Sequence, residues 1–202
     1  MLRIAPRGEA VFNGRIKESI SDAADALNRL ANTRRWRLFC DASLLFEHPL
    51  LKVAADIWRA KSAPDRCPAR AEFSAREMKP FLRDLTILDI VREDGRTRYH
   101  HRYAGTEIEI HFGPITGRYL DEFLPPELVP RTLACFELVA KQRQPLRILT
   151  QFSLPGAEHL GAEVFLFPLS QDGVTADKLM SVTYFRGVRT FGENFPRALT
   201  MY

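Results

Sequence analysis

The sequence predicts an α+β domain built on one five-stranded antiparallel sheet with helices on one face and a helical extension before it. Two strand-like segments come first, three more close the chain, and a helical region lies between the two blocks. The links inside each block have hairpin length, which makes neighbouring strands antiparallel, because parallel strands need a long crossover. One longer helical crossover joins the blocks.

The composition indicates one domain of ordinary size plus an extension, since the chain has 202 residues, 46% of them hydrophobic. No apolar run approaches the length that crosses a bilayer, and the N-terminus lacks the apolar segment of a secretory signal. The three cysteines, Cys40, Cys67 and Cys135, are far apart and odd in number. They argue against a disulfide framework or a zinc cluster and for a cytoplasmic location.

Residues 1–45 are interpreted as a basic, partly helical N-terminal arm. Apolar residues recur every three or four positions between Arg15 and Ala31, the pattern of an amphipathic helix. Residues 1–37 have four more basic than acidic side chains, and the rest of the chain is neutral. The arm leaves open a nucleic-acid-binding regulator, but a neutral domain gives no electrostatic footprint for nucleic acid, which is therefore the less favoured partner.

The main domain is assigned to residues 46–190, and a C-terminal tail to residues 191–202. His48-Pro49 begins a helix that ends near Lys61, since proline suits the first helical position. A short helix follows over 74–82.

The strands are predicted from apolar alternation and from the turn residues between them. Gly95 lies in the first hairpin turn, where a positive φ is needed. Gly105 ends the second strand, and a short apolar helix with Ile108 and Phe112 follows. A longer helix begins at Pro125-Pro126. The expected strands are 85–91, 97–104, 146–154, 160–169 and 179–187.

Three motifs stand in register with this order of elements. They are CPAR (67–70), RYAGTEI (102–108) and TGRYLDE (116–122). Together with the strand order, they resemble a PAS-like domain family of alphaproteobacterial proteins over about residues 48 to 187. The resemblance implies a five-stranded antiparallel sheet, a pocket between the sheet and the helices, and a sensory or regulatory role. It implies no particular ligand or cofactor, because a fold alone does not determine function.

A ligand pocket is predicted from side chains that the elements would place around the centre of the domain. Most are apolar or aromatic, whereas His101, Tyr103 and Thr150 would supply the polar groups that a pocket needs. The alternative is that these residues only fill the core. The candidate pocket residues are His101, Tyr103, Ile108, Phe112, Phe136, Thr150, Phe152, Phe165 and Tyr184.

The helix over 48–61 is free to cover the other face of the sheet. It has more apolar residues than one sheet face needs, and it is the predicted contact surface for a protein partner or for a second copy in a homodimer. The residues of this surface are Leu50, Leu51, Ala54, Ile57 and Trp58.

Neither a catalytic set nor a metal site is expected. His100 and His101 are adjacent and would point to opposite faces of a strand, and no zinc-protease, nucleotide-loop or nucleophile-elbow motif occurs. The helical motif that a flavin-adduct cysteine needs is also not found. The sequence therefore favours a non-catalytic PAS-type sensory or regulatory module in cytoplasmic signalling. A small-molecule enzyme is a less favoured alternative, which would require titratable groups clustered in a cleft.

Overall fold

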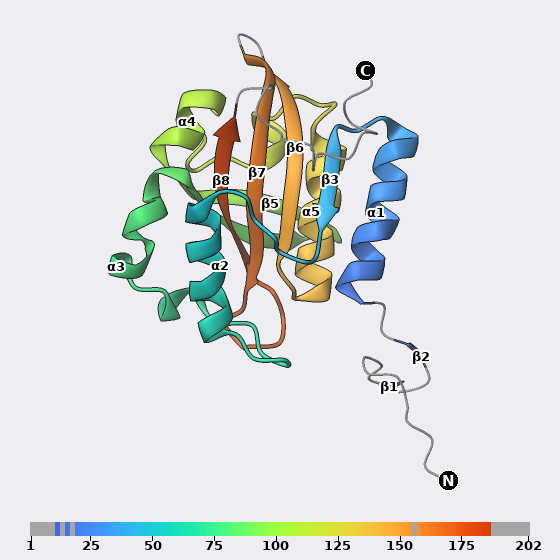
Figure 1. Ribbon diagram of the computed structural model, residues 1–202, viewed down its shortest axis with the longest axis vertical. Helices are drawn as coiled ribbons and strands as arrows, with labels where there is room; N and C mark the ends of the chain where they lie inside the picture. The colour runs from blue at the N-terminus through green and yellow to red at the C-terminus, as the bar shows by residue number, and fades with distance from the viewer. Residues whose placement is uncertain (1–10, 13–14, 17–18, 155–156, 187–202) are drawn as a thin grey trace.

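The computed structural model describes residues 11–12, 15–16, 19–154 and 157–186 (Figure 1). One antiparallel sheet of six strands organises the fold, in the order β3-β6-β7-β8-β4-β5. The predicted α+β class and the five predicted strands are confirmed. The strands of this sheet are β3 (Leu38–Asp41), β4 (Leu85–Glu93), β5 (Arg96–Ala104), β6 (Leu146–Leu154), β7 (Ala157–Leu169) and β8 (Lys178–Arg186).

The helices cover both faces of this sheet. They are α1 (Ile20–Arg34), α2 (Pro49–Lys61), η1 (Arg70–Glu72), α3 (Ala75–Met78), η2 (Lys79–Asp84), α4 (Thr106–Phe112), η3 (Leu120–Glu122) and α5 (Val129–Gln142). The first face packs against α1, α5 and the segment around η3. The second face packs against α2, α3 and η2. A separate two-stranded pair, β1 (Val11–Phe12) and β2 (Arg15–Ile16), precedes α1. The two largest cores therefore lie on opposite faces of one sheet, and a smaller cluster of Ala104, Ile108 and Ile115 packs α4 against the end of β5.

The sixth strand, β3, comes from the segment that the sequence analysis assigns to the arm. It pairs antiparallel with β6 at the edge of the sheet, and α1 lies alongside it (Figure 1). The Asn28 amide of α1 donates to the Cys40 carbonyl at 2.8 Å and accepts from the Cys40 N–H at 2.7 Å. These bonds satisfy backbone groups of an edge strand. β3 is therefore part of the sheet and α1 packs against it, whereas the predicted tail 191–202 lies outside the described residues.

The apolar stripe of α2 is used inside the molecule. Leu51, Ala54 and Trp58 are buried in the core of the second face, and Leu50 and Ile57 are partly buried against it. Three of the five predicted contact residues are therefore not exposed to a partner. The physical reason is that α2 is the main cover of a sheet face that carries large apolar side chains of β7 and β8.

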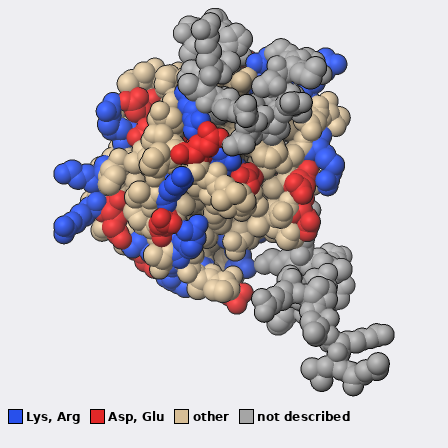
Figure 2. Space-filling model, viewed as in Figure 1, with Lys and Arg blue, Asp and Glu red and all other residues tan. Residues whose placement is uncertain are grey.

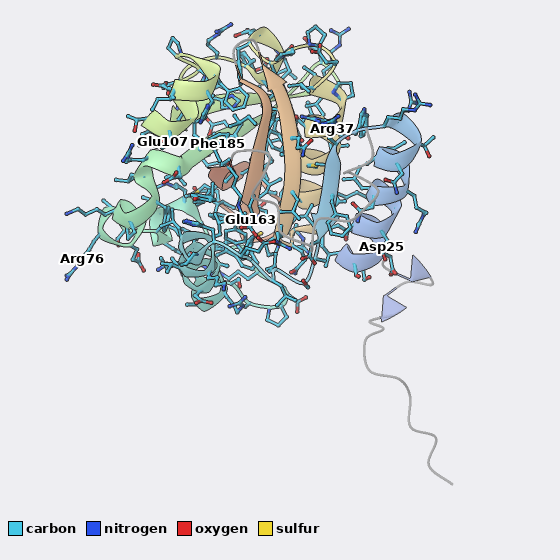
Figure 3. The ribbon with its side chains drawn as sticks, turned by 45° about the horizontal axis from the view of Figure 1, so that its top comes forward. Asp25, Arg37, Arg76, Glu107, Glu163 and Phe185 are labelled. Carbon is cyan, nitrogen blue, oxygen red and sulfur yellow. The ribbon has the colours of Figure 1, made fainter. Side chains whose placement is uncertain are left out.

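A buried ion-pair network joins the start of α2 to the sheet. The Glu163 carboxylate of β7 is fully buried and lies over the middle of the sheet (Figure 3). It accepts from Arg147 Nε at 2.7 Å, from Arg186 Nη2 at 2.9 Å, and from the backbone N–H groups of Glu47 and His48 at 2.9 and 3.0 Å. The network therefore holds the chain where α2 begins, because His48 is the N-cap of that helix.

Candidate functional site

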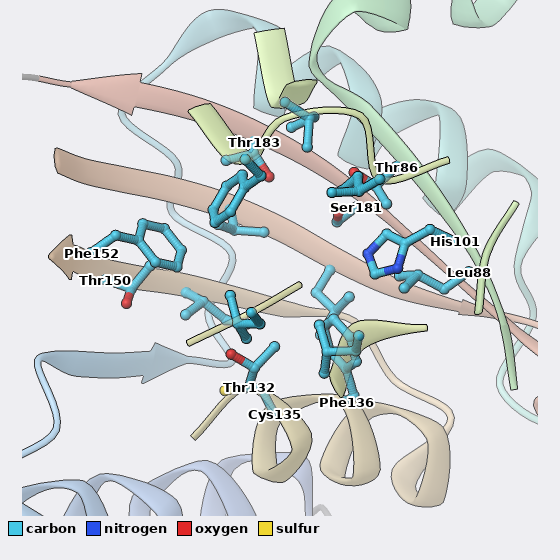
Figure 4. A pocket seen from close by; sticks show the side chains of 18 of the residues that line it. Thr86, Leu88, His101, Thr132, Cys135, Phe136, Thr150, Phe152, Ser181 and Thr183 are labelled. Carbon is cyan, nitrogen blue, oxygen red and sulfur yellow. The ribbon is translucent and has the colours of Figure 1, made fainter. Parts of the chain in front are cut away.

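A cavity of about 120 Å³ lies between the first face of the sheet and α5 (Figure 4). Its walls come from the strands of the sheet, from α4 and α5, and from the segment around η3. Most of the lining side chains are apolar, and a few hydroxyl groups are placed among them. This is the general composition of a small-molecule pocket.

Six of the nine predicted pocket residues line this cavity, and three do not. The lining residues among them are His101, Ile108, Phe112, Phe136, Thr150 and Phe152. Tyr103, Phe165 and Tyr184 lie instead in the core of the second face, under α2.

A β-bulge explains the position of Tyr103. In the pairing of β4 with β5, Ile87 stands opposite Tyr103 and Leu88 opposite His101, which leaves Arg102 as an extra residue. Such an extra residue reverses the alternation of the strand. His101 therefore faces the cavity while Tyr103 faces the other side of the sheet, where its hydroxyl donates to the Leu82 carbonyl of η2 at 3.0 Å, although their spacing of two predicts a common face.

Phe165 and Tyr184 lie on strands that carry large side chains on both faces. On β7, the neighbours Val164 and Leu166 line the cavity, and Phe165 points away from it. On β8, the ring of Tyr184 stacks on His48 with ring centroids 3.6 Å apart. The two-residue period separates two sets of side chains, but it does not say which set faces which layer.

Four cavity hydroxyls were missing from the predicted site, and one of them, that of Thr132, donates to the Leu128 carbonyl. Thr86, Ser181 and Thr183 line the wall formed by β4 and β8 (Figure 4). Within the described residues, their hydroxyl groups form no hydrogen bond. The sequence does contain an indication of two of these hydroxyls. Ser181 and Thr183 alternate with apolar residues in the last predicted strand, so both belong to the same face of that strand.

His101 adds a neutral imidazole to the same wall. Its Nδ1 lies 3.3 Å from the Arg118 carbonyl oxygen. Burial is the main cause that lowers the pKa of His101 to about 4. The imidazole is therefore neutral at pH 7, with Nδ1–H donating to this carbonyl and Nε2 left as a hydrogen-bond acceptor.

Acidification from pH 6.5 to about 4 is expected to destabilise the protein through His101 by about 3 kcal/mol. In this range the unfolded state takes up the proton and the folded state does not, so the free energy of unfolding falls as the pH falls. Urea unfolding at a series of pH values measures this effect. The variant His101→Gln should show a flatter pH profile than the wild type, and the control His48→Gln should keep most of the slope. Parallel profiles for His101→Gln and the wild type would contradict the assignment.

Arg131 brings a buried cation to the cavity from the first turn of α5. Its Nη2 donates to the Gln151 carbonyl at 2.7 Å, and its guanidinium lies 5.3 Å from the centroid of the Phe152 ring. Burial lowers the pKa of Arg131 to about 10, which still leaves it protonated at neutral pH. The sequence analysis missed Arg131, because an arginine in a helix is ordinarily assigned to the solvent side.

The three cysteines are free and buried. Cys135 of α5 lines the cavity, and its sulfur lies 3.9 Å from that of Cys40 on β3. This contact and burial raise the pKa of the Cys40 thiol.

In the described part of the chain, no three side chains of His, Cys, Asp or Glu form a group suited to a metal ion. Among the same residues, no helix has the length and hydropathy needed to span a membrane.

A nucleic-acid-binding protein usually has a basic patch on its surface, so the distribution of charge is relevant to that alternative function. On the face turned to the viewer in Figure 2, Lys and Arg side chains intermingle with Asp and Glu. The first basic side chains of the arm, Arg3, Arg7, Arg15 and Lys17, lie outside the side chains that the structure describes. The function of the arm therefore stays a prediction.

An antiparallel sheet with a cavity between one face and a crossover helix is an α+β architecture with space for a small molecule. The family model of the PAS domain matches residues 46–183. The chain belongs to the PAS domain family, as its motifs and strand order predict. A comparison with curated proteins finds no match.

Solved structures with a similar fold include proteins with light-oxygen-voltage (LOV) domains. The LOV protein of Rhodobacter sphaeroides is 13% identical, with a TM-score of 0.36 over 67% of this chain and 68% of that chain. A blue-light activated histidine kinase of Erythrobacter litoralis is 16% identical, with a TM-score of 0.36 over 55% of this chain and 36% of its own. An RNA-binding light-oxygen-voltage receptor is 13% identical, with a TM-score of 0.39 over 76% and 40%. At these TM-scores, the likenesses support no further inference about this chain.

Proposed function

We propose that this protein is a non-catalytic sensory or regulatory module that binds a small molecule in the cavity under α5. The observation that carries the proposal is the set of hydrogen-bonding groups without partners on an otherwise apolar wall. The hydroxyls of Thr86, Ser181 and Thr183 and the Nε2 atom of His101 converge there. These four groups line the open cavity and are not sealed inside the packed core, so they stay available for hydrogen bonds with a bound molecule.

The size of the cavity sets the size of the ligand. An apolar cavity of about 150 Å³ in another protein binds benzene. The cavity of about 120 Å³ therefore suits a molecule with one ring or a short aliphatic chain. The three-ring system of a flavin is larger than this space.

The sheet offers a route from the cavity to a partner. Val164 and Leu166 of β7 line the cavity, whereas Phe165 and Phe167, between and beside them, pack under α2. A ligand that binds one arrangement of these strands more tightly would shift the position of α2. The partner, a second copy or another protein, would contact the outer side of α2, where Val53 is 44% exposed.

The cytoplasm is the proposed location. Its reducing conditions suit a protein whose three cysteines are free and buried.

A cavity-filling variant tests the proposal. Thr183→Phe places a ring in the space that the ligand would occupy, and Thr97→Phe makes the same change at an exposed position of β5. We expect Thr183→Phe to weaken the binding of single-ring probes such as phenol and benzoate by about tenfold or more. Thr97→Phe should bind like the wild type. Ligand-observed NMR measures binding, and circular dichroism confirms that both variants fold.

Native mass spectrometry of the freshly purified protein gives a second readout. A co-purified small molecule that is present in the wild type and in Thr97→Phe, but lost in Thr183→Phe, would support the proposal. Equal binding by the wild type and a folded Thr183→Phe variant would overturn it.

A further inference from the structure

Arg131 is a buried cation for which the protein supplies little compensation. The residue is 5% exposed, and its guanidinium has five N–H donors. Within the described residues, its hydrogen bonding consists of one bond, to the neutral carbonyl of Gln151, and it forms no ion pair. Burying a charge is costly unless the charge is paired. The contact with the Phe152 ring offsets only a part of this cost.

The charged side chains with an influence on Arg131 are Glu127 and Arg37, and neither lines the cavity. None of the described side chains that line the cavity is an aspartate or a glutamate. Arg37 donates from Nη1 to the Gln151 side chain at 2.7 Å, so two arginines share this one residue. The acid with an influence on Arg131 is Glu127, which is exposed to solvent near the start of α5. An anion in the cavity would therefore meet the charge of Arg131, which no carboxylate among the described lining side chains cancels.

We propose that the ligand of this cavity is a small carboxylic acid, bound as the carboxylate, with its acid group held by Arg131 and its ring or short chain against the apolar wall. This inference rests on the proposed function, because it names the chemical class of the ligand for the same cavity. A carboxylate matches the fork of a guanidinium and can accept two of its parallel N–H bonds.

The positions of the other polar groups in the cavity determine where the remaining substituents of this acid would lie. Arg131 and its partner Gln151 belong to α5 and β6, whereas the free hydroxyls and His101 lie on β8, β4 and β5. In the sheet, β7 separates β6 from β8. The acid group and any hydroxyl or amino substituent of the ligand would therefore lie at different ends of a molecule of about one ring.

A pair of probes of almost equal shape separates the charge from the ring. Benzoate carries the carboxylate, and benzamide is its neutral counterpart. We expect the wild type to bind benzoate about 10- to 100-fold more tightly than benzamide, because the neutral amide offers one acceptor oxygen and cannot form the two-bond ion pair of a carboxylate with a guanidinium. Isothermal titration or chemical-shift titration with the full chain measures both dissociation constants.

Variants assign this preference to Arg131. Arg131→Met should bring the benzoate and benzamide affinities to within about threefold of each other, and Arg131→Lys should retain part of the preference. Lys141→Met is the matched control, because it removes one positive charge from the exposed side of the same helix. It should bind like the wild type. If Arg131→Met does not fold, the ratio of benzoate to benzamide affinity is compared between the wild type and Arg131→Lys. A smaller ratio in Arg131→Lys would still assign the carboxylate contact to Arg131.

Three results would overturn different parts of the proposal. Benzamide bound by the wild type as tightly as benzoate, and displaced by Thr183→Phe, would remove the carboxylate and leave the ligand-binding function standing. An unchanged preference for benzoate in a folded Arg131→Met variant would likewise show that Arg131 does not hold the acid group. Failure of both probes, and of phenol, to bind the wild type would overturn the proposed function and the inference together.

Discussion

Replacing Glu163 with Gln is expected to lower the free energy of unfolding by about 3–5 kcal/mol, the usual cost of removing one partner from a buried ion pair. The carboxylate is fully buried and accepts from Arg147 and Arg186. Gln has almost the same shape, so the main change is the loss of the negative charge between two arginines. Urea unfolding followed by circular dichroism measures the difference.

The control is an exposed ion pair on the surface of α2. Arg59 and Asp56 lie 2.6 Å apart, and their side chains are 61% and 72% exposed. Asp56→Asn removes the same charge with the same change of shape, and it should cost about 1 kcal/mol or less, because water screens this pair. A similar small loss for Glu163→Gln would contradict the view that the buried network holds the start of α2.

A double variant tests whether the loss comes from an imbalance of charge in the network, in which Arg147 also pairs with Asp41 and Glu47, and Arg186 with Glu47. Glu163→Met together with Arg147→Met should cost less than the sum of the two single variants, because the double variant removes one charge of each sign. Additive losses would indicate that the two side chains do not depend on each other.

Trp58→Ala is expected to cost about 3–5 kcal/mol of the free energy of unfolding. The Trp58 ring is buried in the core of the second face, and its Nε1 donates to the Pro168 carbonyl at 3.2 Å. Alanine would leave a cavity beneath α2 and remove this bond. Val53→Ala, on the exposed side of the same helix, is the control and should change stability by about 0.5 kcal/mol or less.

This result also decides how a partner surface on α2 can be tested. An alanine at Trp58 or Leu51 would weaken partner binding simply by loosening α2, since both side chains are buried. Val53→Asp changes the exposed side and leaves the core intact. A loss of stability below about 1 kcal/mol for Trp58→Ala would mean that α2 is not firmly packed, and its buried residues would again be candidates for a partner contact.

The candidate site was predicted in part, and each error has a local cause. His101 and Tyr103 are two residues apart, yet the bulge at Arg102 sends them to opposite faces. The pairing that creates a bulge involves β4, so the pattern of β5 alone does not contain it. Arg131 was not predicted as a lining residue, because its burial depends on how α5 lies over β6, where it reaches Gln151.

The edge strand β3 was also not predicted, because it too depends on a distant segment of the chain. Four residues are too few for a two-residue period to stand out, and Leu38–Asp41 is a strand because it pairs with β6, far along the chain. The amide of Asn28 then closes its outer side. Neither partner can be identified from the strand's own residues.

By itself, the sequence determined the order of five of the six strands of the main sheet, the antiparallel class of this sheet and membership of the PAS family, because periodicity, turn residues and short motifs are local properties of the chain. The tertiary structure alone decided which side of each strand faces the cavity, that β3 joins the sheet, and that a buried arginine lies beside unbonded hydroxyls. These features depend on register and on contacts between distant segments, and a shift of one residue moves every side chain of a strand to the opposite face.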